Sequence, residues 1–327
     1  MHAPDGFLNA GTAVATGAIS MGTVGMALRQ VKQSVEDNQV PLAGIAAAFI
    51  FAAQMFNFPV AAGTTGHLLG GALAAILLGP SLGSVVVTVV VVIQALVFAD
   101  GGMTALGYNI LNMAVIPSFG GYALYLGFRR LLPVSASGVV AAAGLAGWGS
   151  VILSAMAFSV EWLFGATAPV SFAEVFGAMV GVHLLIGVGE AVISGLALGA
   201  VLGARPDLVF GAADLSRADL SRRRGIPVRT FLIGGLMTSL LVAGIISQFA
   251  ADDPDGLESV TTETGIVQTA DDQIFDSSLF ADYATAGIEN ESLSLAIAGV
   301  AGALIVLAVG TGILAAIRLR HDSATTV

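Results

Sequence analysis

Long apolar runs separated by short polar stretches dominate the pattern of this chain. A membrane span needs roughly 20 mostly apolar residues, and re-entrant segments need fewer. Nine candidate segments lie near residues 8–28, 42–58, 66–79, 85–99, 108–128, 137–158, 176–203, 230–250 and 293–317. The third is short and rich in glycine, and the fifth carries Pro117, so we expect both to be broken or only partly immersed. The pattern predicts an all-α polytopic membrane protein, with a bundle of about seven helices followed by a two-helix unit.

The distribution of basic residues predicts a topology for these segments. Short cytoplasmic loops of membrane proteins hold the excess of Lys and Arg. All twelve basic residues of the chain follow the first, fifth, seventh or ninth apolar segment. We therefore expect a multi-pass protein of a prokaryotic plasma membrane, with Met1 outside the cell and Val327 inside.

Polar stretches divide the chain into three parts. We expect a membrane domain over residues 1–205, a basic cytoplasmic linker over 206–229 and a two-span unit over 230–327. The linker contains three consecutive arginines at 222–224. Within the last unit, residues 251–291 hold eleven acidic and no basic residues. This acidic segment is expected outside the membrane, most simply as a solvated surface and alternatively as a collector of cations.

Composition narrows the kinds of site that the chain can hold. Hydrophobic residues make up 56% of the 327 residues and charged residues only 10%, which suits a chain embedded in lipid. There is no cysteine, which excludes disulfides and thiolate ligands, so any metal would bind through nitrogen or oxygen. The first basic residue, Arg29, lies beyond the first apolar segment, and we expect no cleaved signal peptide.

Two histidines on the predicted outer side are candidate metal ligands. The α-amine of Met1, the backbone nitrogen of His2 and the His2 imidazole can close adjacent chelate rings around one ion. Tetragonal nitrogen coordination of this kind suits nickel(II) or copper(II). His67 stands at the outer start of the third segment, where an ionisable side chain is a functional candidate. It can supply a fourth nitrogen, or it can simply bond a neighbouring carbonyl.

Further polar residues could support such a site. His183 and Glu190 lie seven residues apart on one face of the seventh segment. They can form a relay for an ion or, more simply, a buried hydrogen-bonded pair. Five other residues lie at or near the outer ends of apolar segments, where they could orient the ligand imidazoles. They are Gln54, Asn57, Asp100, Asn109 and Asn112.

Two motifs that would indicate enzymatic activity are missing from the sequence. A phosphate-binding P-loop requires Gly-Lys followed by Ser or Thr, but the only lysine, Lys32, follows Val31. ATP-driven transport would therefore need other subunits. An intramembrane metalloprotease would show two histidines four residues apart beside a glutamate, and no such pair exists. We expect a transport component that is not an enzyme and that has no resident cofactor.

Four short motifs resemble one family of membrane proteins. They are Met1-His2-Ala3-Pro4-Asp5-Gly6-Phe7-Leu8, Gly66-His67-Leu68-Leu69-Gly70-Gly71, Phe98-Ala99-Asp100-Gly101-Gly102 and Asn109-Ile110-Leu111-Asn112-Met113. They are similar to motifs of the CbiM/NikM family, the substrate-binding components of energy-coupling-factor (ECF) importers of cobalt and nickel. Further along, Asp253-Pro254-Asp255-Gly256-Leu257-Glu258 resembles the PDGLE motif of the two-span CbiN-type accessory subunit, here fused to the chain.

The resemblance implies a function and a set of ligands. It implies a near-square-planar site formed by the Met1 amine, the backbone nitrogen and imidazole of His2, and the imidazole of His67. It also implies a transmembrane coupling subunit of the CbiQ/NikQ type and cytoplasmic ATPases of the CbiO/NikO type. Ala3 departs from the isoleucine that family members often carry, which affects packing more than chemistry.

The expected function is capture of Ni²⁺ or Co²⁺ outside the cell for an ATP-driven importer, and the choice between the two metals stays open. The alternative is an ion-coupled secondary transporter or channel for divalent cations. Such proteins usually show an internal repeat or charged residues at mid-membrane. Here only His183 and Glu190 approach that description.

Overall fold

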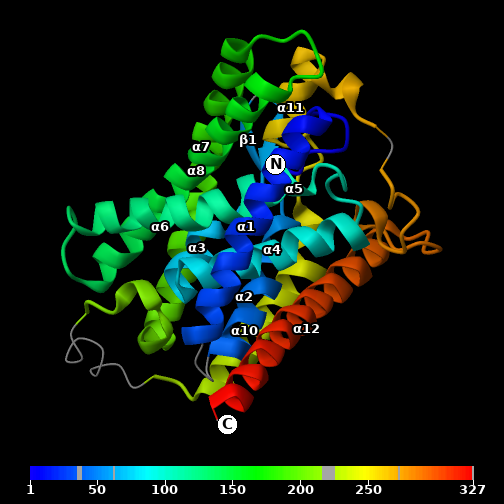
Figure 1. Cartoon of the computed structure of the whole chain (residues 1–327). Helices are drawn as coiled ribbons and strands as arrows, with labels where there is room; N and C mark the ends of the chain where they lie inside the picture. The colour runs from blue at the N-terminus through cyan, green and yellow to red at the C-terminus, as the bar shows by residue number, and fades with distance from the viewer. Residues whose placement is uncertain (35–38, 62, 216–224, 272, 326–327) are drawn as a thin grey trace.

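Helices make up nearly all of the regular structure (Figure 1). The computed structural model describes residues 1–34, 39–61, 63–215, 225–271 and 273–325, with side chains as far as Leu319. Its main helices are α1 (Ala10–Ser34), α2 (Gln39–Gln54), α3 (Gly71–Leu78), α4 (Pro80–Val97), α5 (Leu106–Ile110), α6 (Ile116–Arg129), α7 (Ala136–Gly165), α8 (Phe172–Ala204), α10 (Val228–Gly244), α11 (Gly256–Thr264) and α12 (Glu291–Thr325). Seven helical stretches among the described residues are long and apolar enough to cross a membrane. The prediction of an all-α polytopic membrane protein is confirmed.

Two of the nine predicted segments are shorter than a full span. Helix α2 has 16 residues and α3 has eight, all eight of them buried. The second segment was expected to continue to Phe58, but α2 ends at Gln54. Pro59 disfavours helical backbone at Phe58, so the helix does not reach the predicted end. An antiparallel hairpin of β1 (Phe58–Ala61) and β2 (Thr64–Gly66) follows, and His67 comes directly after β2.

The fifth predicted segment is interrupted, as expected. It consists of α5, a π-helical turn at Leu111–Val115, and α6. Pro117 lies in the first turn of α6 and has no amide hydrogen to donate to the preceding turn. The π-helical turn therefore falls just before the proline, and the stretch Leu106–Arg129 still has the length of a span.

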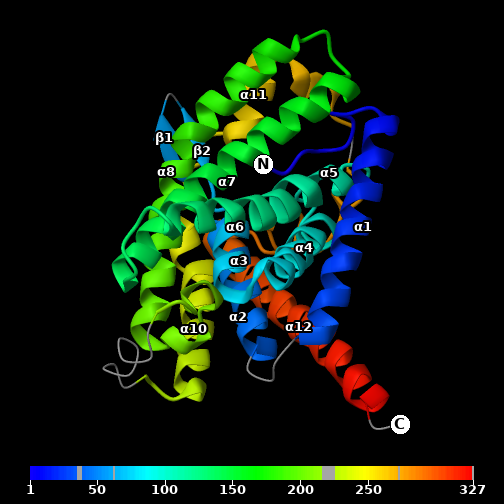
Figure 2. The same cartoon turned by 60° about the vertical axis from the view of Figure 1, so that its left-hand side comes forward.

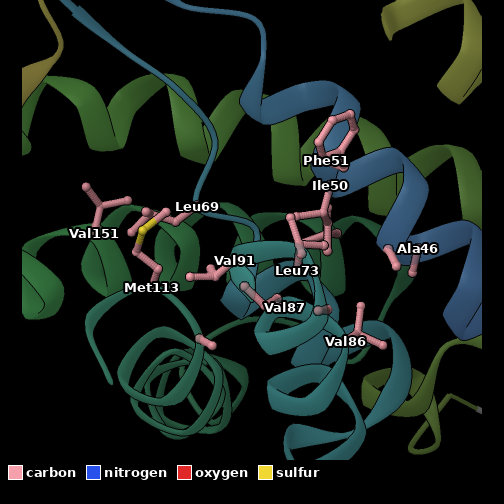
Figure 3. Packing of buried hydrophobic residues seen from close by; sticks show 14 of the residues in the cluster. Ala46, Ile50, Phe51, Leu69, Leu73, Val86, Val87, Val91, Met113 and Val151 are labelled. Carbon is pink, nitrogen blue, oxygen red and sulfur yellow. The ribbon is translucent and has the colours of Figure 1, made fainter. Parts of the chain in front are cut away.

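The core lies where α2, α3 and α4 meet. Ile50 of α2 points toward Leu73 of α3, with Val87 and Val91 of α4 close by, and Phe51 is the next residue of α2 (Figure 3). All five side chains are buried. A helix that is apolar on every side is stable only when other elements surround it, which explains why the short α3 occupies the centre of the bundle.

The C-terminal unit packs along the first bundle. Helices α10 and α12 both contact α2. Gly44 permits this approach, since a Cβ at that position would lie 2.1 Å from Oγ1 of Thr311 on α12. The stretch of sequence that connects α10 to α12 contains α11. It folds over the end of the bundle that holds the N-terminus (Figure 2). There the N–H of Thr65 in β2 donates to the carbonyl of Pro254, at 2.8 Å.

The chain ends lie at opposite ends of the long helices (Figure 1). At the end away from Met1, the last turn of α1 and residues 206–213 after α8 line one pocket. Arg129, the last residue of α6, donates a hydrogen bond to Asp214, at 2.5 Å. Segments that carry basic residues thus meet at one end of the bundle. The three arginines at 222–224 lie outside the described residues, and the boundaries of the three predicted parts stay predictions.

Candidate metal centre

The N-terminal segment is buried and fixed by its own carboxylate. Asp5 is only 4% exposed. Its Oδ1 accepts hydrogen bonds from the backbone N–H groups of Thr104 and Ala105, at 2.7 and 3.2 Å, and from the Thr104 hydroxyl. Its Oδ2 accepts from the N–H of Met103 at 3.2 Å. The carboxylate therefore satisfies the free amides just before α5 and ties the chain start to that helix.

Asn109 holds Ala3 of the same N-terminal segment in place. The N–H of Ala3 donates to Oδ1 of Asn109 at 3.0 Å, and Nδ2 of Asn109 donates to the Ala3 carbonyl at 2.9 Å. The N–H of Gly102 donates to the same carbonyl. A Cβ on Gly102 would lie 2.2 Å from the backbone nitrogen of Asp5, so only glycine fits there. Asn109 was expected near His67 and is bonded here to the chain start, and its supporting role at a metal site stays a prediction.

The amine of Met1 and the imidazole of His67 meet. Nε2 of His67 is 2.8 Å from the α-amino nitrogen. The other ring nitrogen, Nδ1, is 2.9 Å from the carbonyl oxygen of Leu68, which selects the tautomer with the proton on Nδ1. The lone pair of Nε2 then points at the amine. Two nitrogens bound at about 2.0–2.1 Å to one ion at a right angle would stand about 2.9 Å apart, so the observed spacing fits a shared ion.

The imidazole of His2 lies beside that of His67 but faces other partners. The two ring centres are 5.4 Å apart. Nδ1 of His2 is 3.2 Å from Oδ1 of Asp100, and Nε2 is 3.0 Å from Oε1 of Gln94. Burial lowers the pKa of His2 to about 4, although the Asp100 carboxylate opposes that shift. The ring is therefore neutral at pH 7, which is the form that binds a metal.

The loop after His67 is held by a carboxylate from α8. Oε2 and Oε1 of Glu190 accept hydrogen bonds from the N–H groups of Leu69 and Gly70, at 2.6 and 3.0 Å. Nε2 of Gln54 donates to the Leu69 carbonyl at 3.0 Å. Gln54 and Glu190 thus fix the backbone that carries the His67 ring.

His183 and Glu190 do not form the hydrogen-bonded pair that was one of the two expectations. Nδ1 of His183 is 2.7 Å from the Met179 carbonyl oxygen on its own helix. Nε2 of His183 is buried and has no partner among the described residues. It lines a small cavity together with Met1, His67 and Asp255. The predicted relay role stays a prediction.

The remaining predicted residues are spread more widely. Asn112 donates to Oε2 of Glu161 on α7, at 2.7 Å, and belongs to a different polar contact. Asn57 lines the cleft that contains His2 and His67, and its carbonyl accepts from the N–H of Ala251. Asp100 contacts His2 directly, as described above.

Sequence reasoning missed Asp255 as a site residue, although it lies within the quoted PDGLE motif. Its Oδ2 is 2.6 Å from the Met1 nitrogen and 3.6 Å from Nε2 of His67. Burial raises the pKa of this carboxyl, but the Met1 ammonium and His67 together bring it well below its usual value. The signal for Gln94 was weaker, because it is one of two polar residues in the run from Val85 to Ala99.

An acidic cleft of about 610 Å³ leads to the two histidines, and both units line it. Its carboxylates belong to Asp100, Asp252, Asp253, Asp255, Glu258 and Asp282. No three His, Cys, Asp or Glu side chains among the described residues form a metal site by themselves. A metal centre here would therefore need main-chain nitrogens, which the Met1 amine and the His2 amide can supply.

Comparison with protein families gives two matches that cover most of the chain. Residues 2–208 match CbiM, described as the cobalt uptake substrate-specific transmembrane region. Residues 229–319 match the PDGLE domain.

Several relatives are similar to the chain. The fused nickel transport protein NikMN of Rhodobacter capsulatus is 30% identical, over 97% of this chain and 98% of the relative. A putative fused nickel transport protein NikMN of Archaeoglobus fulgidus is 32% identical, over 95% of this chain and 97% of its own length. A crystal structure of a truncated transition metal transporter superposes with a TM-score of 0.55 at 35% identity, over 62% of this chain and 98% of that one.

Proposed function

The chain belongs to the CbiM family of transmembrane metal-uptake proteins and carries a PDGLE domain, and on this premise we propose that it captures Ni²⁺ or Co²⁺ at its N-terminus for an ATP-driven ECF-type importer. The observation that carries this proposal is the 2.8 Å approach of the Met1 amine to Nε2 of His67. Both residues are buried, and His67 also lines the acidic cleft. Nitrogen donors of this type suit late divalent transition metals rather than magnesium or calcium.

The proposed ligands are four nitrogens. The Met1 amine and Nε2 of His67 already have the spacing of neighbouring ligands. The backbone nitrogen of His2 follows the amine in the chain. The His2 imidazole completes the set after its ring turns away from Asp100 and Gln94. Metal binding releases protons from such donors, so affinity should rise with pH.

The direction of transport follows from the charges at the two ends of the bundle. Carboxylates line the cleft around the N-terminus and would attract cations. Basic residues lie near the ends of α1 and α6 and directly after α8, at the other end. Under the positive-inside rule, the cleft faces the outside and the basic end faces the cytoplasm.

We propose partner subunits as the source of energy. The single lysine does not stand in a P-loop, so ATP hydrolysis would come from paired cytoplasmic ATPases that act through a transmembrane coupling subunit. The ion-coupled alternative needs a charged group in the bundle that is free to bind the ion. The carboxylate of Glu190 is occupied by two backbone N–H groups, which favours the ATP-driven proposal.

The test is metal titration of the purified chain with its native N-terminus. Nickel(II) and cobalt(II) are titrated separately by calorimetry, beside His2→Ala and His67→Ala variants. His321→Ala serves as the matched control, because this histidine follows the last apolar segment, far along the chain from the proposed ligands. One ion per chain in the parent, with binding lost in both ligand variants and kept in the control, is the expected result. Equal binding by parent and ligand variants would refute the site.

A further inference from the structure

The carboxylate of Asp255 reaches the two nitrogens that the proposed function assigns to the metal. Its Oδ2 is 2.6 Å from the Met1 nitrogen and 3.6 Å from Nε2 of His67. The two nitrogens are themselves 2.8 Å apart. These three atoms, from three distant parts of the sequence, face the same small cavity. Oxygen and nitrogen ligands of one transition-metal ion have separations of this size when each binds at about 2.0–2.2 Å.

The fold holds this oxygen in position before any ion arrives. The other oxygen of Asp255, Oδ1, accepts from the N–H groups of Leu257 and Glu258 and caps α11. The preceding carbonyl, of Pro254, accepts from the N–H of Thr65 in β2. Gly256 lies against α8 so closely that a Cβ there would be 2.4 Å from Cδ1 of Ile186. One oxygen of the carboxylate is thus structural, and the other is left for the cavity.

The fourth nitrogen of the proposed site is directed elsewhere in this conformation. Both ring nitrogens of His2 have partners, with Nδ1 at 3.2 Å from Asp100 and Nε2 at 3.0 Å from Gln94. The hydroxyl of Tyr283 bonds both of these partners and so fixes them. The groups that converge on the Met1 amine are consequently His67 and Asp255, and the His2 imidazole is not among them.

We propose that Asp255 is a temporary oxygen ligand, which receives the incoming divalent ion together with Met1 and His67 and is later replaced by the imidazole of His2. This inference rests on the proposed function and adds a loading step to it. The ion takes the place of the proton that Met1 shares with Asp255, and that proton leaves to water. The backbone nitrogen of His2 binds the ion when its own proton has also left to water. Nickel(II) and cobalt(II) bind imidazole more readily than carboxylate, so the exchange proceeds toward the four-nitrogen site.

This step gives the C-terminal unit a defined chemical role. Asp255 belongs to that unit, whereas Met1, His2 and His67 belong to the first bundle. The carboxylate supplies a negative charge that offsets the ion during entry into a buried site. Once the imidazole replaces it, Asp255 is no longer bound to the ion.

The experiment follows metal capture in time. The purified full chain is mixed rapidly with nickel(II) or cobalt(II), and the visible absorption of the bound ion reports both the rate and the final ligand set. Asp255→Asn keeps an oxygen that can cap α11 and removes the charge from the cavity. Asp253→Asn is the matched control, because it removes the same charge from the same cleft two residues away. Thermal unfolding of each variant checks that the fold is kept.

The expected result is slower capture by Asp255→Asn, by roughly tenfold to a hundredfold. Asp253→Asn should stay within about twofold of the parent, because exposed rim charges contribute little. The final spectrum of Asp255→Asn should match that of the parent, because Asp255 is absent from the completed site. A parental rate in Asp255→Asn, or equal slowing in both variants, would overturn the proposal.

A further variant, Asp100→Asn, tests the replacement of Asp255 by the His2 imidazole. Asp100→Asn weakens the hold on the His2 imidazole, so that the ring can reach the ion without delay. Asp255→Asn should then slow capture less in the Asp100→Asn background than in the parent, and equal slowing would overturn the exchange. The two proposals fail differently. If the parent protein binds no metal, both proposals are refuted. If binding requires His67 but Asp255→Asn captures metal at the parental rate, only the role of Asp255 is refuted.

Discussion

Nε2 of His67 lies 2.8 Å from the α-amino nitrogen of Met1, although the two residues are 66 positions apart in the chain. The contact depends on a free amine, since an acyl group would occupy the space that His67 and Asp255 surround. In the proposed site the chain start itself supplies ligands, so any change to it should act directly on metal binding.

Blocking the amine should abolish metal capture. One glycine placed before Met1, or acetylation of Met1, removes a donor and displaces the His2 amide. We expect nickel(II) affinity to fall by more than the roughly hundredfold loss typical of outer-shell changes. Calorimetric titration measures the nickel(II) affinity, and a chain with one glycine added after Val327 is the control. Tight binding by a blocked chain would contradict the site.

Glu190 should control the position of His67 through the backbone. Glu190→Ala leaves the N–H groups of Leu69 and Gly70 buried without an acceptor, which costs about 1–3 kcal/mol for each group. We expect a lower unfolding temperature and a metal affinity reduced by roughly tenfold or more. Glu190→Gln keeps one acceptor and should lose less.

The control for this prediction lies on the same helix. Glu174 is exposed in the first turn of α8, and its carboxylate accepts a hydrogen bond from the Ser171 hydroxyl. Glu174→Gln should leave both stability and affinity near parental values. Equal effects of the two Gln variants would show that Glu190 has no special link to His67.

Asp5 should matter for affinity although it does not face the ion. Asp5→Ala removes the acceptor of three backbone N–H groups and one hydroxyl, and we expect a stability loss of about 2–4 kcal/mol. The chain start would then be free to move, and metal affinity should fall as well. Chemical unfolding and metal titration measure the two effects. Asp207→Asn, which removes an exposed partner of Arg205, should change neither.

Acid should destabilise the metal-free protein through His2. Its pKa is about 4 in the fold, compared with 6.5 for a free imidazole, so between these values the unfolded chain binds more protons. Stability should therefore decrease as pH falls from 6.5 toward 4, by on the order of 1.4 kcal/mol per pH unit at most.

Thermal unfolding at a series of pH values measures this decrease. The groups that face His2 are Asp100, the Met1 amine, His67 and Gln94. His2→Gln removes only the His2 contribution and should flatten the curve between pH 4 and 6.5. A variant with the parental slope would assign the acid sensitivity to other groups.

Much of the fold could be predicted from local pattern. The apolar runs located seven spans, because length and hydropathy are properties of each run alone. Pro117 marked the interrupted segment for the same reason. The hairpin before His67 was not predicted, because β1 and β2 are only four and three residues long. A pairing that short has no periodicity to detect.

The candidate site was predictable only in part. Met1, His2 and His67 were identified from chelate chemistry and from a resemblance, and the structure places all three together. Asp255 was not identified, because its contact with Met1 spans 254 positions and depends on how the C-terminal unit packs against the first bundle. Asn112 was a candidate for supporting the site because it lies toward the outer end of an apolar segment. Asn112 lies three residues beyond Asn109, and its side chain points toward Glu161 on α7 instead.

The backbone hydrogen bond from Thr65 to Pro254 joins the first bundle to the C-terminal unit, and both belong to one polypeptide. Two separate chains would have to meet by diffusion, and the fraction in contact would then depend on how much of each the cell makes. A covalent tether replaces that encounter with a fixed local concentration, which dilution of the protein in the membrane does not lower. Each capturing bundle is therefore supplied with its own PDGLE segment, in a constant one-to-one ratio.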